Sequence, residues 1–200
     1  MAGRPSKQEA ETGGRERLLA AAARLFAAKG YAATSVRDIL KAAKVTAPVL
    51  YYHFGNKEGI FLALAREGVE KLNAAFAAAV ERTGTAAEKV RAFCRAGAAV
   101  RREFEDLAWV VEAALSGPPN AAPRLNIRGV VADTLRRLGE VIDTGVASGE
   151  FRPCDSEHVA LALMGAVEMV ARPRLRDLST AKLDKQLEGM ISVILAGLSA

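Results

Sequence analysis

Apolar residues recur through most of this chain at intervals of three and four positions, the spacing of amphipathic α-helices. From residue 15 onward the apolar positions are Leu18, Leu19, Ala22, Leu25 and Phe26, and this pattern closes at Lys29-Gly30, so it predicts a first helix over 15–29. Period-two alternation is scarce, and alanine, the strongest helix former, supplies 40 of the 200 residues. The pattern therefore predicts an all-α protein of about nine helices.

Two short helices are predicted after the first. Ser35-Val36-Arg37-Asp38 has the spacing of a capping box, with Asp in the place of the usual Glu or Gln, and it opens a helix that reaches Ala43. Thr46 is expected to cap a helix over 47–52, whose first turn tolerates Pro48. Two short helices joined by about three residues and packed on a longer first helix form a helix-turn-helix, whose second helix enters the major groove of DNA.

The remaining pattern predicts further helices in the body of the chain. Asn56 is expected to cap a fourth helix that runs to about residue 82, and Gly117-Pro118-Pro119-Asn120 marks a break. The other predicted helices cover 86–101, 104–115, 121–148, 155–172 and 179–200.

Positive charge is concentrated near the N-terminus. Residues 1–57 hold ten Lys and Arg against four acids, a net +6, whereas residues 58–200 have a net charge of −1. This imbalance favours a polyanionic partner. We therefore expect a flexible basic arm over 1–14, a DNA-binding domain over 15–57 and a separate domain over 58–200.

The composition excludes several classes of protein. No run approaches the ~18 apolar residues of a membrane span, and the polar N-terminus lacks a signal sequence, so a cytoplasmic protein without a membrane partner is expected. The chain has only two cysteines, Cys94 and Cys154, and two histidines, with no glycine-rich phosphate loop and no set of residues that suggests a nucleophile with its base. We expect no enzyme activity, no cofactor and no metal. Cys94 is expected to be an inert buried thiol, with a redox-sensing role as the alternative.

Three stretches resemble the tetracycline-repressor (TetR) family. They are Gly30-Tyr-Ala-Ala-Thr-Ser-Val-Arg-Asp-Ile39, Ala42-Ala-Lys-Val-Thr46 and Leu50-Tyr-Tyr-His-Phe-Gly-Asn-Lys-Glu58, and the resemblance covers about residues 15–62. It implies a helix-turn-helix head on a C-terminal ligand-binding and dimerisation body. Lys44 departs from the family pattern, because it stands in the turn where a glycine with positive φ is usual.

The resemblance also implies which residues contact DNA. Lys57, at the start of the fourth helix, is expected to bind a phosphate, the alternative being a solvated lysine. Tyr51 and His53 resemble phosphate and groove-edge contacts, although both also suit packing, and Tyr52 is expected to point to the core with Leu50 and Phe54. The hydroxyls of Ser35 and Thr46 are expected to reach phosphates, although capping alone would explain both. Base contacts are expected from Ala47, Pro48 and Val49, with Val36 or Arg37 from the second helix. Arg4 resembles a minor-groove contact, the alternative being a disordered tail.

One recognition helix contacts too few base pairs to specify a single site in a genome, so a homodimer on a near-palindromic double-stranded operator is expected. Two late apolar stripes offer a surface for this contact, and an intrachain core explains them equally well. The expected interface residues are Val159, Leu163, Leu187, Met190, Ile191, Ile194, Leu195 and Leu198.

The family resemblance implies a small-molecule effector bound in the body. Large or adaptable apolar residues that suit its pocket, or else the core, are Phe93, Phe104, Trp109 and Met164. Glu112 and Glu168 lie within apolar stretches, so each is expected to pair with an arginine such as Arg128 or to face a polar cavity. The sequence thus predicts a DNA-binding transcriptional repressor controlled by a ligand, the alternative being a helical module that binds protein or membrane.

Overall fold

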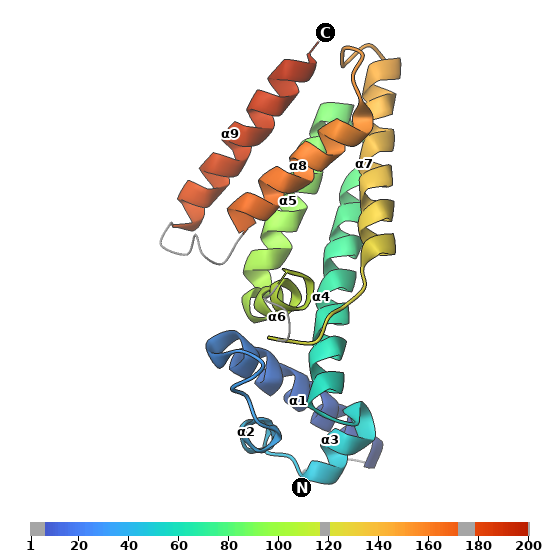
Figure 1. The fold of residues 1–200 in the computed structure, drawn as a ribbon. Helices are drawn as coiled ribbons and strands as arrows, with labels where there is room; N and C mark the ends of the chain where they lie inside the picture. Colours follow the sequence, from blue (N-terminus) through green and yellow to red (C-terminus); the bar gives the residue numbers. More distant parts are fainter. Residues whose placement is uncertain (1–6, 117–120, 172–178, 200) are drawn as a thin grey trace, which may run out of the picture. The chain divides into compact units, whose positions relative to one another are not determined.

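The computed structural model describes residues 7–116, 121–171 and 179–199 of the chain, and over these residues it is all-α (Figure 1). They form nine helices, with Phe151 and Ser199 making the one isolated β-bridge. The helices are α1 (Lys7–Lys29), α2 (Val36–Ala43), α3 (Ala47–Phe54), α4 (Lys57–Val80), α5 (Ala86–Glu103), α6 (Glu105–Ser116), α7 (Arg128–Ala147), α8 (Ser156–Ala171) and α9 (Thr180–Leu198). None of the helices in the described part of the chain is long and apolar enough to cross a membrane.

Two helix starts differ from those that the sequence predicts. Helix α1 begins at Lys7, so residues 7–14 are helical rather than part of a flexible arm, and Arg4 lies outside the described residues. Gly14 is buried within α1, where an added Cβ would lie 3.1 Å from Cγ1 of Val49, so a glycine here serves close packing against α3. Helix α7 begins at Arg128 rather than near 121, and the segment before it is tied to α6, because the backbone N–H of Leu125 donates to the carbonyl of Ala114 at 3.3 Å.

The chain divides into two packing units, of which unit 1 comprises 1–69 and 104–126. Its core joins α1, α2, α3, the first part of α4 and α6, with Leu18, Ile39, Leu50, Phe61 and Val110 all buried. The sequence-based boundary at residue 57 follows the DNA-binding motif, whereas the packing of α6 on α1 brings a later segment into this unit. The head is therefore supported by residues that lie far from it in the sequence.

Unit 2 comprises 70–103 and 127–200 and contains α5, α7, α8, α9 and the end of α4. Phe93, Leu138, Leu163 and Ile191 are among its fully buried side chains, and the Phe93 ring stacks on Phe76 with 4.2 Å between the ring centroids. Glu150, in the turn between α7 and α8, accepts hydrogen bonds from the backbone N–H groups of Ala86 (2.8 Å) and Ala87 (2.9 Å). This carboxylate therefore caps the start of α5.

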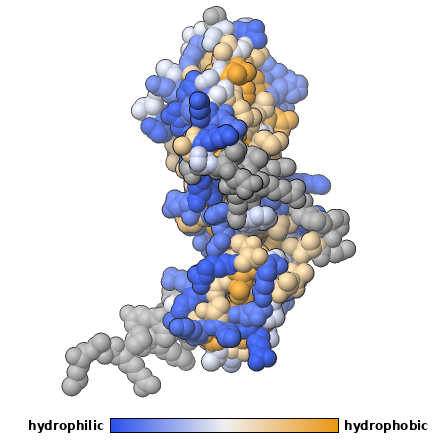
Figure 2. Space-filling view, turned by 90° about the vertical axis from the view of Figure 1, so that its left-hand side faces the viewer, coloured by the Kyte–Doolittle hydropathy of each residue, from blue (hydrophilic) through white to orange (hydrophobic). Residues whose placement is uncertain are grey.

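Most of the residues expected at a dimer interface belong to the core of unit 2 instead. Of the eight, Met190 alone is exposed, and Val159 and Ile194 are half-buried against the core. The five that are buried in the core are Leu163, Leu187, Ile191, Leu195 and Leu198. The intrachain core that the sequence left open as the alternative accounts for these seven residues, because an apolar stripe does not reveal which partner covers it. The exposed large apolar residues of α8 and α9 are Leu161, Met169, Met190 and Val193. Figure 2 is seen from the side on which α9 lies in Figure 1, and it shows hydrophobic residues among the hydrophilic ones on this face.

Candidate nucleic-acid interface

Helix α2 is fixed at its start by the capping box that the sequence predicts. The backbone N–H of Asp38 donates to Ser35 Oγ (3.1 Å), and the backbone N–H of Ser35 donates to Asp38 Oδ2 (3.0 Å). Lys29, at the end of α1, pairs with the same carboxylate at 2.7 Å. The hydrogen bonds from Lys29 and from Ser35 hold the pKa of Asp38 well below its usual range. The start of α2 is thus tied to the end of α1.

The turn between α2 and α3 passes through Lys44 in a left-handed conformation, with φ 54° and ψ 46°. Lys44 is the one non-glycine residue with positive φ among the residues that the structure describes. The strain expected from the missing glycine is therefore present. The turn is closed by the backbone N–H of Lys44 and that of Val45, both of which donate to the carbonyl of Leu40.

Helix α3 exposes a different set of residues from the one that the sequence predicts. Thr46 stands at the N-cap with an extended backbone, but its side chain makes no capping hydrogen bond within the described part of the chain. Pro48 is exposed, whereas Ala47 and Val49 are half-buried, Val49 against the core of unit 1. Of the three apolar residues expected to read bases, Pro48 is therefore the most accessible.

Tyr51 and Tyr52 are the large exposed side chains of α3. Tyr51 is 54% exposed, and Tyr52 is 78% exposed, so the expectation that Tyr52 packs in the core is wrong. Alternation along the chain is a property of strands, whereas successive residues of a helix turn by about 100°. Leu50 and Phe54, which are four residues apart, share the inner face, and Tyr52 between them faces outward. Helical spacing would have placed Tyr52 correctly.

His53 lies on the edge of the head core. His53 is half-buried, and the centroid of its ring lies 4.9 Å from that of the Tyr52 ring and 6.0 Å from that of the Phe54 ring. Its Nε2 atom is buried and has no hydrogen-bond partner among the described residues. In this conformation, that nitrogen faces the protein rather than solvent, so any contact of His53 with DNA involves a different part of the ring.

Lys57, the first residue of α4, is held by the turn between α1 and α2. Its ammonium donates to the backbone carbonyls of Tyr31 and Thr34, both at 2.9 Å, and lies 4.1 Å from the centroid of the Tyr31 ring. An ammonium has three N–H donors, so these two bonds leave at most one for a phosphate. The structure therefore gives Lys57 a role in fixing the head, in addition to the phosphate contact that the family resemblance implies.

A side-chain cap and a close backbone contact fix where α4 begins. The side-chain Oδ1 of Asn56 accepts from the backbone N–H of Gly59 at 2.8 Å, which confirms the predicted cap. At Gly59 an added Cβ would lie 1.9 Å from the carbonyl oxygen of Phe54, so only glycine fits this junction of α3 and α4.

Exposed cations flank the helix-turn-helix. Arg37 and Lys41 lie exposed on α2, and Lys44 lies exposed in the turn. Sequence reasoning selected Arg37 as a DNA contact and left out the two lysines, although their charge contributed to the excess that it noted. Tyr51 and Tyr52 of α3 are exposed as well, so the helix-turn-helix presents both cationic and aromatic side chains to solvent, residue types that suit contact with a phosphate backbone.

The residues expected to line an effector pocket are divided between the two units. Phe104, Trp109 and Glu112 belong to unit 1, and Phe93, Arg128, Met164 and Glu168 belong to unit 2. Phe93 is core, Met164 is half-buried against that core, and Glu168 forms an ion pair with Arg101 rather than with Arg128. Cys94 is buried as expected, and burial raises the pKa of its thiol to about 12, so it is poorly suited to redox sensing.

Helices α2 and α3 are joined by the strained turn and pack on α1. This arrangement is a helix-turn-helix, a motif of DNA-binding proteins. Residues 18–64 match the family model for bacterial regulatory proteins of the tetR family. This segment of the chain is therefore similar to the DNA-binding domain of that family.

Curated relatives resemble the chain chiefly in the head. The transcriptional repressor AcnR of Corynebacterium glutamicum is 39% identical over 61 residues, which cover 30% of this chain and 32% of that repressor. The chain thus matches about a third of the length of the first of these relatives. The transcriptional repressor KstR2 of Rhodococcus jostii is 26% identical over 204 residues, covering 95% of this chain and 93% of that protein.

A solved structure extends the likeness to the whole fold. The TetR family transcriptional regulator PfmR of Thermus thermophilus superposes with a TM-score of 0.76 and 28% identity. The superposition covers 92% of this chain and 100% of that one.

Proposed function

We propose that this protein is a sequence-specific transcriptional repressor that binds double-stranded DNA and does not catalyse a reaction. The exposed face of α3 carries the proposal, because Tyr51 and Tyr52 are large, accessible side chains on the helix that such motifs insert into the major groove. Arg37, Lys41 and Lys44 supply the positive charge around it. A DNA-binding regulator of this kind works in the cytoplasm.

Base recognition falls to few residues in this proposal. Pro48 and the tyrosine rings offer apolar and single hydrogen-bond contacts, so Arg37 is the side chain able to form a bidentate contact with a guanine, worth about 1–3 kcal/mol of discrimination. Replacing Arg37 with alanine is expected to lower affinity for the operator more than affinity for random DNA. Equal losses for both would show that Arg37 contacts phosphates only.

The experiment that tests the function starts from a random double-stranded library. Sequences selected by the full chain are expected to contain two related half-sites about one helical turn apart, or a multiple of that distance. Their affinity, measured by fluorescence anisotropy, should fall steeply as salt is raised, because phosphate contacts release counterions. Absence of selection, or affinity that does not respond to salt, would reject the function and favour a protein- or membrane-binding module.

We also propose a homodimer formed by the exposed apolar residues of α8 and α9. Leu161 and Met169 of α8 and Met190 and Val193 of α9 support it, because these two helices pack on each other and both carry exposed large apolar side chains. An added Cβ at Gly165 would contact nothing within 4 Å, so this surface permits close approach of a second chain. Light scattering after size exclusion should give twice the mass of one chain. The V193E and L161E variants should elute as monomers with an unchanged circular dichroism spectrum.

A small-molecule effector that changes operator affinity is the last part of the proposal. It rests on the similarity to the tetR family, and unit 2, which contains α5, α7, α8 and α9, is the part of the chain in which we look for its site. An effector acts only if it binds one DNA-binding state of the protein better than the other. The anisotropy assay with candidate ligands measures that difference directly.

A further inference from the structure

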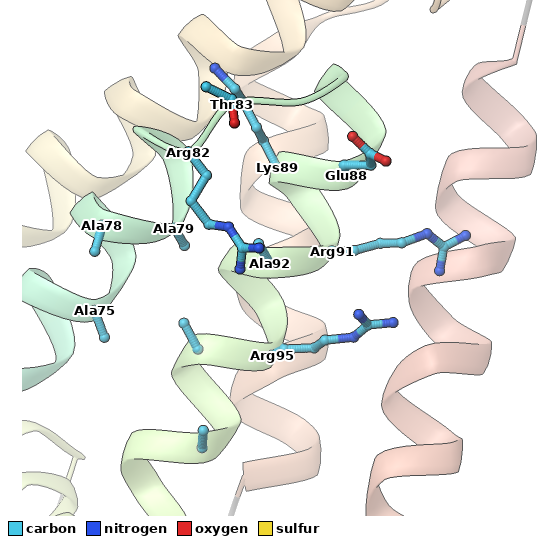
Figure 3. A pocket seen from close by; sticks show the side chains of 12 residues that line it. Ala75, Ala78, Ala79, Arg82, Thr83, Glu88, Lys89, Arg91, Ala92 and Arg95 are labelled. Carbon is cyan, nitrogen blue, oxygen red and sulfur yellow. The ribbon is translucent and has the colours of Figure 1, made fainter.

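A groove in unit 2 lies along α5 beside the end of α4 (Figure 3). Its volume is about 680 Å³, which is within the size range of small-molecule sites. None of the residues that the sequence suggested for an effector pocket lines it. Methyl groups of three residues on each helix line this groove: Ala75, Ala78, Ala79, Ala92, Ala96 and Ala99.

The sides of this groove are strongly cationic. Arg82, Lys89, Arg91 and Arg95 line it, and Glu88 is the acid among its lining residues. The Glu88 carboxylate already accepts a hydrogen bond from the backbone N–H of Thr85 at 2.9 Å, which caps the start of α5. In Figure 3, Arg82 extends from the end of α4 toward α5. The groove therefore combines an apolar lining with an excess of positive charge.

Two of these cations are held in place from α9. Glu188 accepts from Nη1 of Arg91 at 3.2 Å and from Nε of Arg95 at 2.5 Å. The ion pairs lower the pKa of Glu188 and raise the pKa of Arg95. A guanidinium carries five N–H donors, so each arginine retains donors beyond the bonds it makes to the described residues. Arg91 Nη1 also donates to Ser192 Oγ at 3.4 Å. In Figure 3 both arginine side chains extend from α5 toward α9, so their guanidinium groups lie at the α9 side of the groove, where their remaining donors can bind a second anion.

We propose that this groove binds a small organic anion with an alkyl chain, and that the anion competes with Glu188 for Arg91 and Arg95. The carboxylate or phosphate group of the ligand lies against the cationic sides, and the alkyl chain covers the alanine methyl groups, whose burial favours binding by about 25 cal/mol per Å². Competition with Glu188 for the two arginines weakens the link between α5 and α9, the helix that carries Met190 and Val193. The anion is then the effector of the proposed function, on which this inference rests.

Calorimetric titration of the full chain with octanoate, octyl phosphate and 1-octanol tests the ligand class. Both anions, or one of them, should bind at least about tenfold more tightly than the neutral alcohol, and the stronger anion identifies the head group. Equal affinity for the alcohol, or no binding of any of the three, would overturn the proposal.

Variants test the location of the site. K89Q, which removes one charge from the groove, and A96L, which fills its lining, should each weaken binding of the stronger anion at least about fivefold. E188Q should strengthen it severalfold, because the competing carboxylate is gone. R152Q and A132L change exposed residues outside the groove and serve as matched controls, which should bind like the parent chain. Unchanged affinity in K89Q, with a circular dichroism spectrum like that of the parent chain, would place the anion elsewhere and reject the groove.

Operator binding is measured separately, so that the two proposals fail separately. A chain that selects an operator but binds none of the alkyl anions retains its proposed function and loses the groove. A chain that binds the anions through Lys89 but selects no DNA retains the groove and loses the proposed function.

Discussion

Replacement of Lys57 by methionine is expected to destabilise the DNA-binding head. The Lys57 ammonium joins α4 to the turn between α1 and α2 through the carbonyls of Tyr31 and Thr34, each at 2.9 Å. Methionine has a similar length and fills much of the same space, but it has no hydrogen to donate. The variant therefore removes the two hydrogen bonds and the charge while leaving most of the packing.

The loss can be estimated from these contacts. A hydrogen bond to a charged group contributes about 1.5–3 kcal/mol, and partial exposure of Lys57 favours the low end of that range. The ammonium over the Tyr31 ring, at 4.1 Å, adds about 0.5–1 kcal/mol. After allowing for the side-chain entropy that methionine also loses, we expect a net loss of about 2–3 kcal/mol. In a chain of this length, 1 kcal/mol corresponds to roughly 2–4 °C, so the melting temperature should fall by roughly 4–12 °C.

Differential scanning calorimetry measures this change, and K41M provides the control. Lys41 is exposed on α2, so its replacement should leave the melting temperature within about 1–2 °C of the parent, as for most surface substitutions. If K57M and K41M have the same melting temperature, Lys57 does not stabilise the head and the reasoning is refuted.

The K57M variant also separates positioning from phosphate binding. Loss of one phosphate contact lowers the slope of log affinity against log salt by about 0.9. If Lys57 acts only by fixing the turn, K57M should lower operator affinity at every salt concentration without that change in slope. A slope reduced by about 0.9 would instead show that the third donor of Lys57 binds a phosphate.

Three further predictions concern the local geometry of the head. K44G should raise the melting temperature by roughly 2–4 °C, since it relieves about 1 kcal/mol of strain at φ 54°, and a lower melting temperature would contradict this. D38N should make the free energy of unfolding less dependent on pH in acid. The pKa of Asp38 is lower in the folded state than in the unfolded state, so its contribution to stability is present above about pH 4 and is lost as the pH falls through the folded-state pKa. Denaturant titrations from pH 6 downward measure this, and parallel stability curves for D38N and the parent chain would contradict the prediction. G59A should prevent stable folding of the head, because its Cβ would lie 1.9 Å from the Phe54 carbonyl oxygen. The control G165A should fold, because its Cβ would meet nothing within 4 Å. Circular dichroism that shows both variants equally folded would exclude the clash at Gly59.

The sequence was sufficient for the architecture of the head because its signals are local. Ser35 and Asp38 form a capping box within four residues, and Asn56 caps α4 through the N–H three residues later. The positive φ of Lys44 likewise follows from the tight turn in which it lies. Such signals depend on backbone hydrogen bonds between near neighbours, so they remain valid whatever the rest of the chain does.

Features that depend on distant residues could not be predicted in this way. The partners of Lys57 are carbonyls 23 and 26 residues away, and Arg101 meets Glu168 across 67 residues. The inclusion of α6 in unit 1 also rests on contacts that no local pattern contains. The error at Tyr52 was different, since it came from applying a strand period to a helical segment.

Helix α9 shows how the sequence could have separated its two apolar faces. Leu187, Ile191, Leu195 and Leu198 recur every three or four residues and are buried within the chain, so they account for one face. The charged residues of α9 all lie before residue 189, which leaves its last ten residues without a charge on any side. A surface helix normally keeps a polar outer face, and one that is apolar all round is buried on more than one side. The face around Val193, which is 75% exposed in a single chain, lacks the charges of an ordinary solvent face, and this supports placing the proposed subunit contact there.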